Sequence, residues 1–322
     1  MKIRNDERLM VEAVVGFAAD EGFDLTRLSH DWLLVLRKGQ RTHTVFGYDV
    51  GLNSATCLRV CNDKAASFDV LRAAGVPMIE HRLFLEPIMH RFTGLPGNWS
   101  RILEAFSTFD RDVVVKANEG TSGNDVHRVR DTAELERVVH LLLQSCRSIA
   151  VSPFVSLKAE KRFVILDGEI MLAYAKARAA ATGDGASTVR QLAAASLSPE
   201  TAESFGEWLG NQAREDLDRI PRRGEPVYFG WRHNLGHGAR AETIPPDDRN
   251  HKPAAGLALD AAAATGLRFG SVDVAERASD GAPVIMEVNA GVMLEHFGRR
   301  DAEARQQAMD IYRSALARVF AD

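Results

Sequence analysis

Two apolar segments near the end of the printed sequence constrain the fold of this 322-residue chain more than any other feature. Residues 269–274 and 284–290 consist largely of β-branched and other apolar residues, which is typical of buried strands. Asp280-Gly281 lies between them and is a turn signal. We therefore expect the two segments to form neighbouring antiparallel strands.

Three polar residues interrupt these segments, namely Asp273 in the first and Glu287 and Asn289 in the second. Residues two apart in a strand share a face, so Glu287 and Asn289 are expected to point the same way. Antiparallel pairing can bring Asp273 within about 5 Å of them. Carboxylate and amide oxygens are ligands for hard cations such as Mg2+, so the three residues predict a site for one or two divalent ions. The alternative is that they face different sides, with residues 284–290 ending as an ordinary strand in water.

Composition limits the class of protein. The 44 acidic residues nearly balance the 40 basic ones, which argues against a general nucleic-acid binder. No run approaches the ~20 apolar residues of a membrane span, and charges throughout residues 1–20 argue against a signal peptide. The three cysteines are too few for a disulfide framework. We expect a cytoplasmic protein that binds neither membranes nor nucleic acid.

Residues 62–75 are predicted to form a helix. Asn62 can cap its N-terminus, Asp63 suits the positive end of the helix dipole, and Gly75 is expected to end it. Lys64 is unusual, because a cation in the first turn opposes the dipole. It is either a solvated lysine or a contact for an anion such as a phosphate.

A second lysine ends the predicted strand 112–116. The loop that follows contains Gly120 and Gly123, and residues 126–129 alternate as the next strand. A P-loop or dinucleotide-binding loop would join a strand to a helix, so neither is predicted here. A glycine-rich hairpin can instead offer backbone N–H groups to phosphates, although a plain hairpin turn fits the same pattern.

The remaining pattern predicts a mixed α+β chain. Pro153 interrupts the apolar segment 149–155, which suggests a sheet edge or a hinge. Asp167-Gly168 predicts a two-residue hairpin between residues 162–166 and 169–174. Further helices are expected at residues 5–20, 131–143, 187–196, 200–218, 253–265 and 301–320, and further strands at 32–36, 42–46 and 227–229.

In this order the segments resemble the ATP-grasp superfamily of carboxylate–amine ligases, and most of all the ATP-grasp part of cyanophycin synthetase and related amino-acid ligases. The likeness covers about residues 58–297. The matching residues are Asn62-Asp63-Lys64, Ala74-Gly75-Val76-Pro77, Val113-Val114-Val115-Lys116 with Gly120 and Gly123, Arg162-Phe163-Val164-Ile165 with Asp167-Gly168, Gly183 to Val189, Asn234-Leu235 with Gly238, Asp273, and Glu287-Val288-Asn289-Ala290.

The resemblance implies a fold of the α+β / α/β class, in which two α+β subdomains grip ATP. A short N-terminal α/β unit would occupy residues 1–61, a lid subdomain residues 62–150, and a C-terminal subdomain with the metal site residues 151–322.

The resemblance also implies roles for residues. Those that bind the nucleotide would be Lys64 and Lys116 on the phosphates, Gly120, Ser122 and Gly123 in a closing loop, Phe154 and Val155 along the adenine, and Glu160 near the ribose or phosphates. The metal ligands would be Asp273, Glu287 and Asn289, and the residues that face the γ-phosphate and the substrate carboxylate would be Arg162, Arg178 and Asn234.

By the same resemblance the chain would use ATP with Mg2+, as two ions or with Mn2+ in their place. It would phosphorylate an amino-acid or small-peptide carboxylate and join it to an amine, releasing ADP and phosphate. A ligase acting on a protein or peptide terminus and a non-catalytic ATP sensor stay open, as does a homodimer. Residues 290–296 lack the Pro-Gly turn that often follows the Glu-x-Asn strand in this family, so the substrate class is not predicted.

Overall fold

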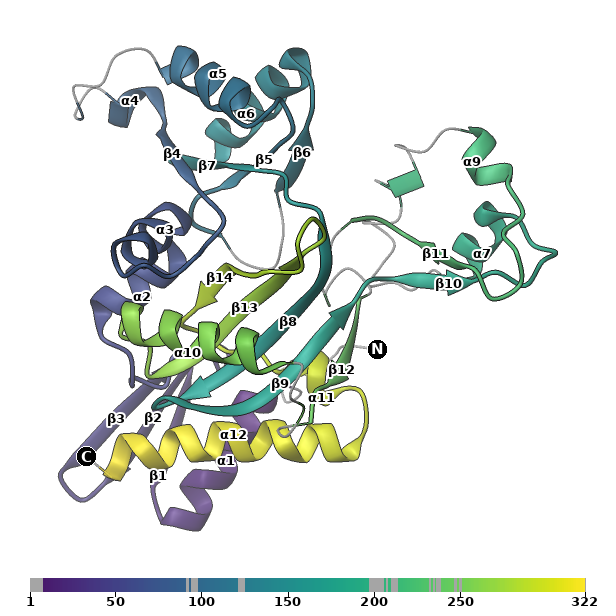
Figure 1. Cartoon of the computed structure of the whole chain (residues 1–322). Helices are drawn as coiled ribbons and strands as arrows, with labels where there is room; N and C mark the ends of the chain where they lie inside the picture. The colour runs from purple at the N-terminus through teal and green to yellow at the C-terminus, as the bar shows by residue number, and fades with distance from the viewer. Residues whose placement is uncertain are drawn as a thin grey trace.

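The computed structural model describes residues 8–90, 93, 98–120, 125–196, 206, 208–209, 214–231, 233, 235, 239–245, 248 and 251–321. A five-stranded antiparallel sheet lies at its centre, in the order β12-β9-β8-β13-β14 (Figure 1). Its strands are β8 (Leu157–Leu166), β9 (Glu169–Ala177), β12 (Arg240–Thr243), β13 (Phe269–Arg277) and β14 (Pro283–Asn289). The predicted antiparallel pairing of the last two strands is confirmed.

The β8–β9 hairpin has the predicted two-residue turn. Asp167 and Gly168 have φ angles of 47° and 80°, which are the left-handed values that such a turn requires. A one-residue register shift between Val164 and Ile165 then places Arg162 of β8 opposite Tyr174 of β9.

Alternating side chains divide the central sheet into two faces. On one face Phe163, Val272 and Val288 pack in an apolar cluster with helices α2 (Ala55–Asn62), α3 (Lys64–Ala73) and α10 (Lys252–Thr265). On the other face Val164, Tyr174 and Phe269 pack against α1 (Leu9–Glu21), α11 (Glu295–Gly298) and α12 (Ala302–Ala321). This second face is apolar only under these helices, since polar and charged side chains occupy the remainder.

A four-stranded sheet, called here the lid sheet, lies at the top of Figure 1 and has the order β4-β7-β5-β6. Its strands are β4 (Arg82–Leu85), β5 (Val113–Ala117), β6 (Val126–Val129) and β7 (Ser148–Pro153), and its helices include α4 (Pro87–His90), α5 (Asn98–Thr108) and α6 (Thr132–Ser145). Residues of α5 and α6 pack on one face of the sheet in an apolar core of its own.

The lid sheet corrects one prediction. β7 lies between β4 and β5, so the segment around Pro153 is not a sheet edge. Pro153 is the last residue of β7 and precedes the link to β8, so its missing N–H falls at the end of the ladder. The suggested hinge stays a prediction.

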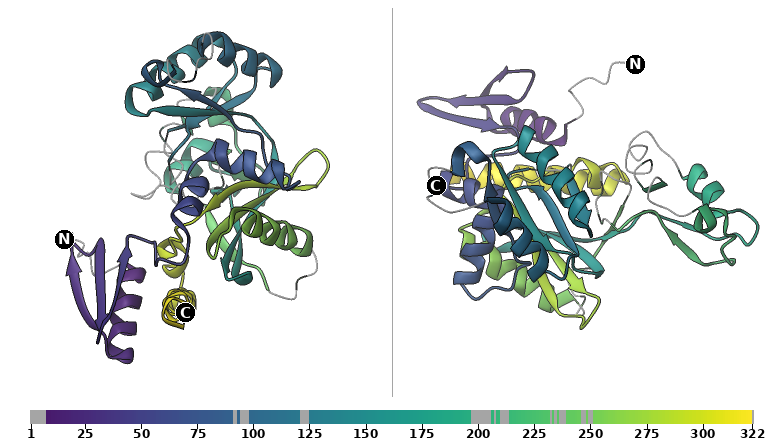
Figure 2. Two further views of the ribbon diagram at one scale, coloured as in Figure 1. Left: turned by 90° about the vertical axis from the view of Figure 1, so that its left-hand side faces the viewer. Right: turned by 90° about the horizontal axis from the view of Figure 1, so that it is seen from above.

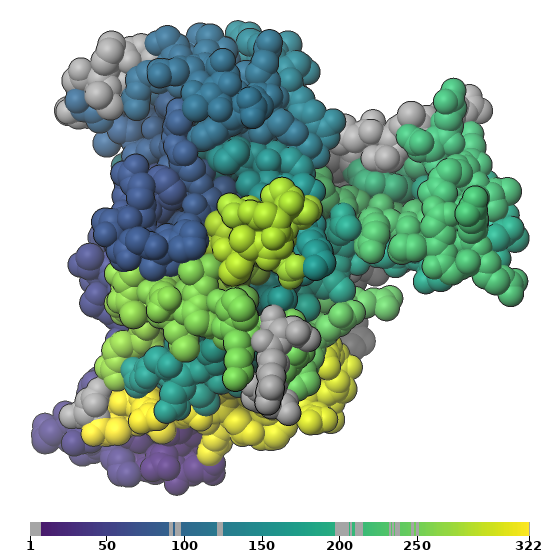
Figure 3. Space-filling model, viewed as in Figure 1, coloured from purple at the N-terminus to yellow at the C-terminus, as the bar shows by residue number. Residues whose placement is uncertain are grey.

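Two smaller units flank the centre. Near the N-terminus, α1 joins an antiparallel sheet of β1 (Asp24–Leu28), β2 (Leu33–Lys38) and β3 (Arg41–Phe46), beside α12 (Figure 2). An arm projects from the body at the right of Figure 3. Its elements are β10 (Ala180–Thr182), α7 (Val189–Ala195), α9 (Arg214–Asp218) and β11 (Pro226–Tyr228).

The helix caps near residue 63 differ from the prediction. Asn62 ends α2 and does not cap the next helix, because Asp63 takes that position and accepts a bond from the Ala66 amide at 2.8 Å. The predicted stop at Gly75 agrees with its φ of 74°.

The proposed division at residues 61 and 150 stays a prediction, although α3 packs with the central sheet and not with the lid core. No described helix is long and apolar enough to cross a membrane.

Candidate active site

A row of four side chains crosses the second face of the central sheet, the one that α1, α11 and α12 partly cover. Tyr174 of β9 pairs with Arg162 of β8, Arg162 with Asp273 of β13, and Asp273 with Glu287 of β14. Asn289 lies two residues further along β14, opposite Ser271. The expected meeting of Asp273 with Glu287 across neighbouring strands is confirmed by this register. We call Tyr174, Arg162, Asp273 and Glu287 the charged row.

Asp273 is 2% exposed and fully engaged with cations. The Arg162 guanidinium donates to both of its oxygens at 2.7 Å, and Lys176 Nζ donates to Oδ2 at 2.8 Å. Burial works against the charged carboxylate, but Arg162 and Lys176 outweigh it and hold the pKa of Asp273 well below its usual range. Lys176 also binds Glu160 at 2.5 Å, so the buried Lys176 and the part-buried Arg162 balance two buried carboxylates.

This network bears on three predicted roles. In this structure Arg162 and Asp273 bind each other, and Glu160 binds Lys176. Their predicted contacts, with substrate, metal and nucleotide respectively, stay predictions. A metal ion could bind Asp273 only if the carboxylate gave up some of its hydrogen bonds to Arg162 and Lys176.

Lys64 is buried, which excludes the solvated lysine that the sequence left open. Its Nζ donates to the Gly120 carbonyl oxygen at 2.9 Å and lies 3.5 Å from Glu287 Oε1. The bond to Gly120 ties α3 to the loop after β5, and the ion pair ties it to the charged row.

Lys116 of β5 belongs to the same group. Burial and the charge of Lys64 lower its pKa, Glu287 and Glu160 act in the opposite direction, and the net pKa is about 8. Two lysines and two carboxylates from α3, the lid sheet and the central sheet therefore interact electrostatically. An anion between the lysines would relieve their mutual repulsion.

This pKa predicts a pH dependence for anion binding. Above pH 8 a growing fraction of Lys116 is neutral in the free protein, so an ATP analogue should bind up to about tenfold more weakly per pH unit. Calorimetric titration between about pH 7 and 9.5 measures the affinity for the analogue at each pH. The Lys116→Arg variant keeps its charge and should show no such fall. An equal fall in this variant would assign the effect to another group.

A cavity of about 130 Å³ lies between the lid sheet and the central sheet. It is called here the inter-sheet cavity. Lys116, Phe154, Val155 and Arg178 line it, so the structure brings four predicted site residues together. The Phe154 ring packs between Arg128, whose guanidinium lies 3.3 Å from the ring centroid, and Trp231.

Other lining residues were not predicted. They include Ile79, His81, Ser152, Leu157 and Met286. Met286 lies in the predicted strand 284–290 and Ser152 in the segment 149–155, but neither pattern indicated a place at the site, and only the pairing of strands far apart in sequence brings the five residues together. Lys176 was missed for the same reason. Ser122, Gly123 and Asn234 lie outside the described residues.

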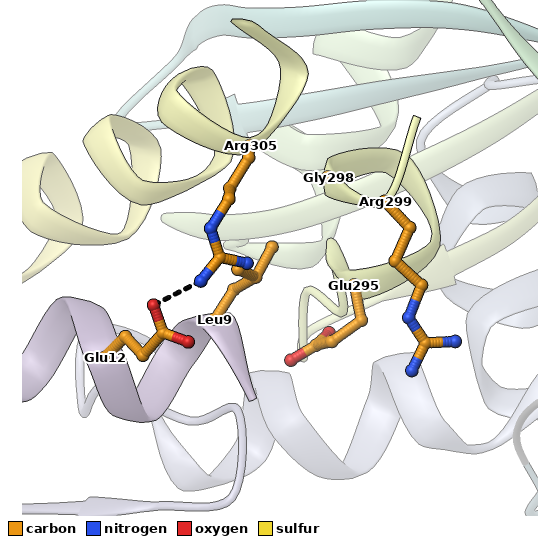
Figure 4. Close-up of a pocket in the computed structure, with 6 residues that line it drawn as sticks. All are labelled: Leu9, Glu12, Glu295, Gly298, Arg299 and Arg305. Carbon is orange, nitrogen blue, oxygen red and sulfur yellow. Dashed lines mark hydrogen bonds and ion pairs between the residues drawn. The ribbon is translucent and has the colours of Figure 1, made fainter. Parts of the chain in front are cut away.

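A second cavity, of about 270 Å³, lies between α1, α11 and the start of α12 (Figure 4). Glu12 and Arg305 point toward one another across it and form an ion pair. Glu295 is buried there, and burial raises the pKa of its carboxyl group. None of the predicted site residues lines this cavity, so the inter-sheet cavity is the candidate nucleotide site.

No family model matches the chain, and no curated protein is significantly similar to it in sequence. Solved structures do resemble it. A bifunctional glutathione synthetase from Pasteurella multocida superposes with a TM-score of 0.57 at 16% identity over 99% of this chain. A D-alanine–D-alanine ligase from Bacillus anthracis gives 0.53 at 16% identity over 83%.

These similarities establish the fold. The chain has the mixed α+β fold of these ligases, which is the ATP-grasp fold that the sequence resemblance implied. It spans 45% of the glutathione synthetase chain and 71% of the D-alanine–D-alanine ligase chain. Cyanophycin synthetase, the nearest likeness suggested by the sequence, is not among these similarities.

Proposed function

We propose that this protein is an ATP-dependent ligase. It activates an amino-acid or small-peptide carboxylate as an acyl phosphate, joins it to an amine, and releases ADP and phosphate. The observation that carries the proposal is the convergence of Lys64, Lys116 and Glu287, from three separate elements, beside a cavity between two sheets. The fold shared with two amino-acid ligases supports the same reaction class.

The inter-sheet cavity suits a nucleotide. Its apolar residues Val114, Leu157 and Met286 can hold the base, while Lys116 and Arg178 add positive charge to the lining. Lys64 lies on the Glu287 side, next to the charged row. The phosphates are therefore assigned to the two lysines, and the base to the segment of Phe154 and Val155.

Glu287 and Asn289 suit a divalent ion. The Glu287 side chain is 32% exposed, and Asn289 Nδ2 lies 3.4 Å from Glu287 Oε2, so the two side chains can turn oxygens to one point. Among the described residues no three acidic, histidine or cysteine side chains form a metal cluster, so phosphate oxygens would complete the coordination. When bound, Mg2+ neutralises charge on the transferring phosphoryl group.

The reaction balances without a redox step. A carboxylate oxygen of the first substrate attacks the γ-phosphorus, and ADP leaves. The amine nitrogen of the second substrate then attacks the acyl carbon, phosphate leaves, and the amine loses a proton. The lysines hold the nucleotide and offset the negative charge of the two reactants, and the lid sheet excludes water from the acyl phosphate.

An assay of ADP release tests the proposal. Single amino acids, short peptides and pairs of them are supplied with ATP and Mg2+. We expect release only when a carboxylate and an amine are both present. ATP binding without turnover across a broad panel would instead favour a nucleotide sensor, and turnover only with a whole protein would favour a ligase of protein termini.

A further inference from the structure

His81 lies on the face of the lid sheet that lines the inter-sheet cavity. It immediately precedes β4, whose Arg82 pairs with Val151, so His81 lies beside Ser152. Ser152 pairs in turn with Val114 of β5. Neighbours across a sheet share a face, and all three residues line the cavity.

This position lies along the lid sheet between Lys116 and the Phe154 segment, and the charges of Lys116 and Lys64 both act on it. Lys116 is two residues beyond Val114 along β5, which is about 7 Å at the rise of a strand. On the other side, Ser152 is two residues from Phe154 of the linking segment. A nucleotide whose phosphates contact Lys116 and whose base lies along Phe154 therefore passes beside His81, within reach of its base.

The His81 ring offers a single hydrogen-bonding function to the cavity. Its Nδ1 lies 2.8 Å from the Ile79 carbonyl oxygen, which can only accept, so Nδ1 carries the proton. Burial, helped by the charge of Lys116, holds the pKa of His81 well below its usual range, so the ring is neutral. Nε2 is thus an acceptor only.

Within the part of the chain that the structure describes, Nε2 has no hydrogen-bond partner, although His81 is only 4% exposed. A buried acceptor without a partner is costly and marks a place where a ligand completes the bonding. Adenine carries one donor group on its base, the exocyclic amine, since its ring nitrogens N1, N3 and N7 only accept.

We propose that His81 selects adenine over other purines by accepting a hydrogen bond from the exocyclic amine at Nε2. The inference rests on the proposed nucleotide site and adds the residue that reads the base. Hypoxanthine places a carbonyl oxygen where adenine has the amine, so two acceptors would face each other. Unsubstituted purine has neither group and would leave Nε2 unpaired.

The test compares the affinities of the full chain for ATP, ITP and purine riboside triphosphate by calorimetry with Mg2+. Wild-type protein should bind ATP about ten- to hundredfold more tightly than either analogue. In His81→Phe, which keeps a ring but has no acceptor, ATP should weaken and the three affinities should fall within about threefold. His81→Gln restores an acceptor and should recover part of the preference. The control His140→Phe changes an exposed histidine on α6 and should leave the preference for ATP unchanged.

Each outcome of these titrations either supports or overturns the role of His81 in base selection. Equal affinities in wild-type protein, or an unchanged ATP preference in His81→Phe, would overturn the role of His81. The wild-type series needs no variant, so a His81 variant that fails to fold does not affect it. If no nucleotide binds to wild-type protein, the proposed function itself fails, and that result differs from loss of selectivity alone.

Discussion

Glu287→Gln should lower the rate of ADP release by about a hundred- to thousandfold and leave the fold intact. The substitution keeps the shape of the side chain and removes its charge. That charge lies 3.5 Å from Lys64, raises the pKa of Lys116, and stands beside Asn289 at the proposed metal position. The side chain is partly exposed, so the free energy of unfolding should change little.

The matched control is Glu169→Gln, an exposed glutamate at the start of β9 in the same sheet. It should leave turnover and unfolding unchanged. Steady-state rates at saturating ATP and Mg2+ make the comparison. If Glu287→Gln turned over at the wild-type rate at ordinary Mg2+ concentration, Glu287 would have no part in the mechanism.

Asp273→Ala should lower the free energy of unfolding by about 3–5 kcal/mol, the largest stability effect we expect in this site. The substitution removes the buried acceptor of three hydrogen bonds. It leaves Glu160 as the carboxylate that acts on Lys176 and Glu287 as the one that acts on Arg162. Urea denaturation at neutral pH measures the change.

The pH dependence of this difference has a definite sign. The folded pKa of Asp273 is lowered, so the carboxylate stabilises the protein above its unfolded value of 3.8 and loses this effect as the pH falls further. The difference in free energy of unfolding between wild-type protein and Asp273→Ala should therefore narrow below about pH 4.

Adding Arg162→Met to Asp273→Ala should recover part of the lost free energy of unfolding, since it removes one unpaired cation. A loss below about 1 kcal/mol for Asp273→Ala would contradict a structural role for this network.

The acidic side of the site could be predicted because it depends on local pattern. Alternation placed Glu287 and Asn289 on one face, and one turn joined them to the strand of Asp273. The cations that neutralise Asp273 come from β8 and β9, whose register with β13 is fixed only when the whole sheet forms. The sequence could therefore suggest a metal ligand but could not reveal that Arg162 and Lys176 hold it.

Short elements were the main gap in the predicted fold. β1, β4 and β12 have five, four and four residues, too few to establish a clear alternation. The strong hairpin at Asp167-Gly168 and the helix ended by Gly266 were predictable, because each carries its own turn or cap residue. The cap near residue 63 was misplaced by one residue, since Asn62 and Asp63 are both good caps.

His81 shows a different limit of sequence reasoning. His81 is notable because its buried Nε2 has no hydrogen-bond partner among the described residues. Only the folded structure shows which groups surround that nitrogen, so the sequence could not indicate it. The loop 291–296 is similar. Its last two residues belong to α11 and place Glu295 at the second cavity, a position that no sequence pattern indicated.

A crystal structure with a non-hydrolysable ATP analogue and Mn2+ tests the central claim most directly. We predict that the base lies along Phe154 and Val155, that the phosphates contact Lys64 and Lys116, and that anomalous scattering places Mn2+ on Glu287 and Asn289. The same maps report whether Asp273 leaves Arg162 to join the metal. An analogue bound outside the inter-sheet cavity, or Mn2+ bound away from Glu287, would contradict the account.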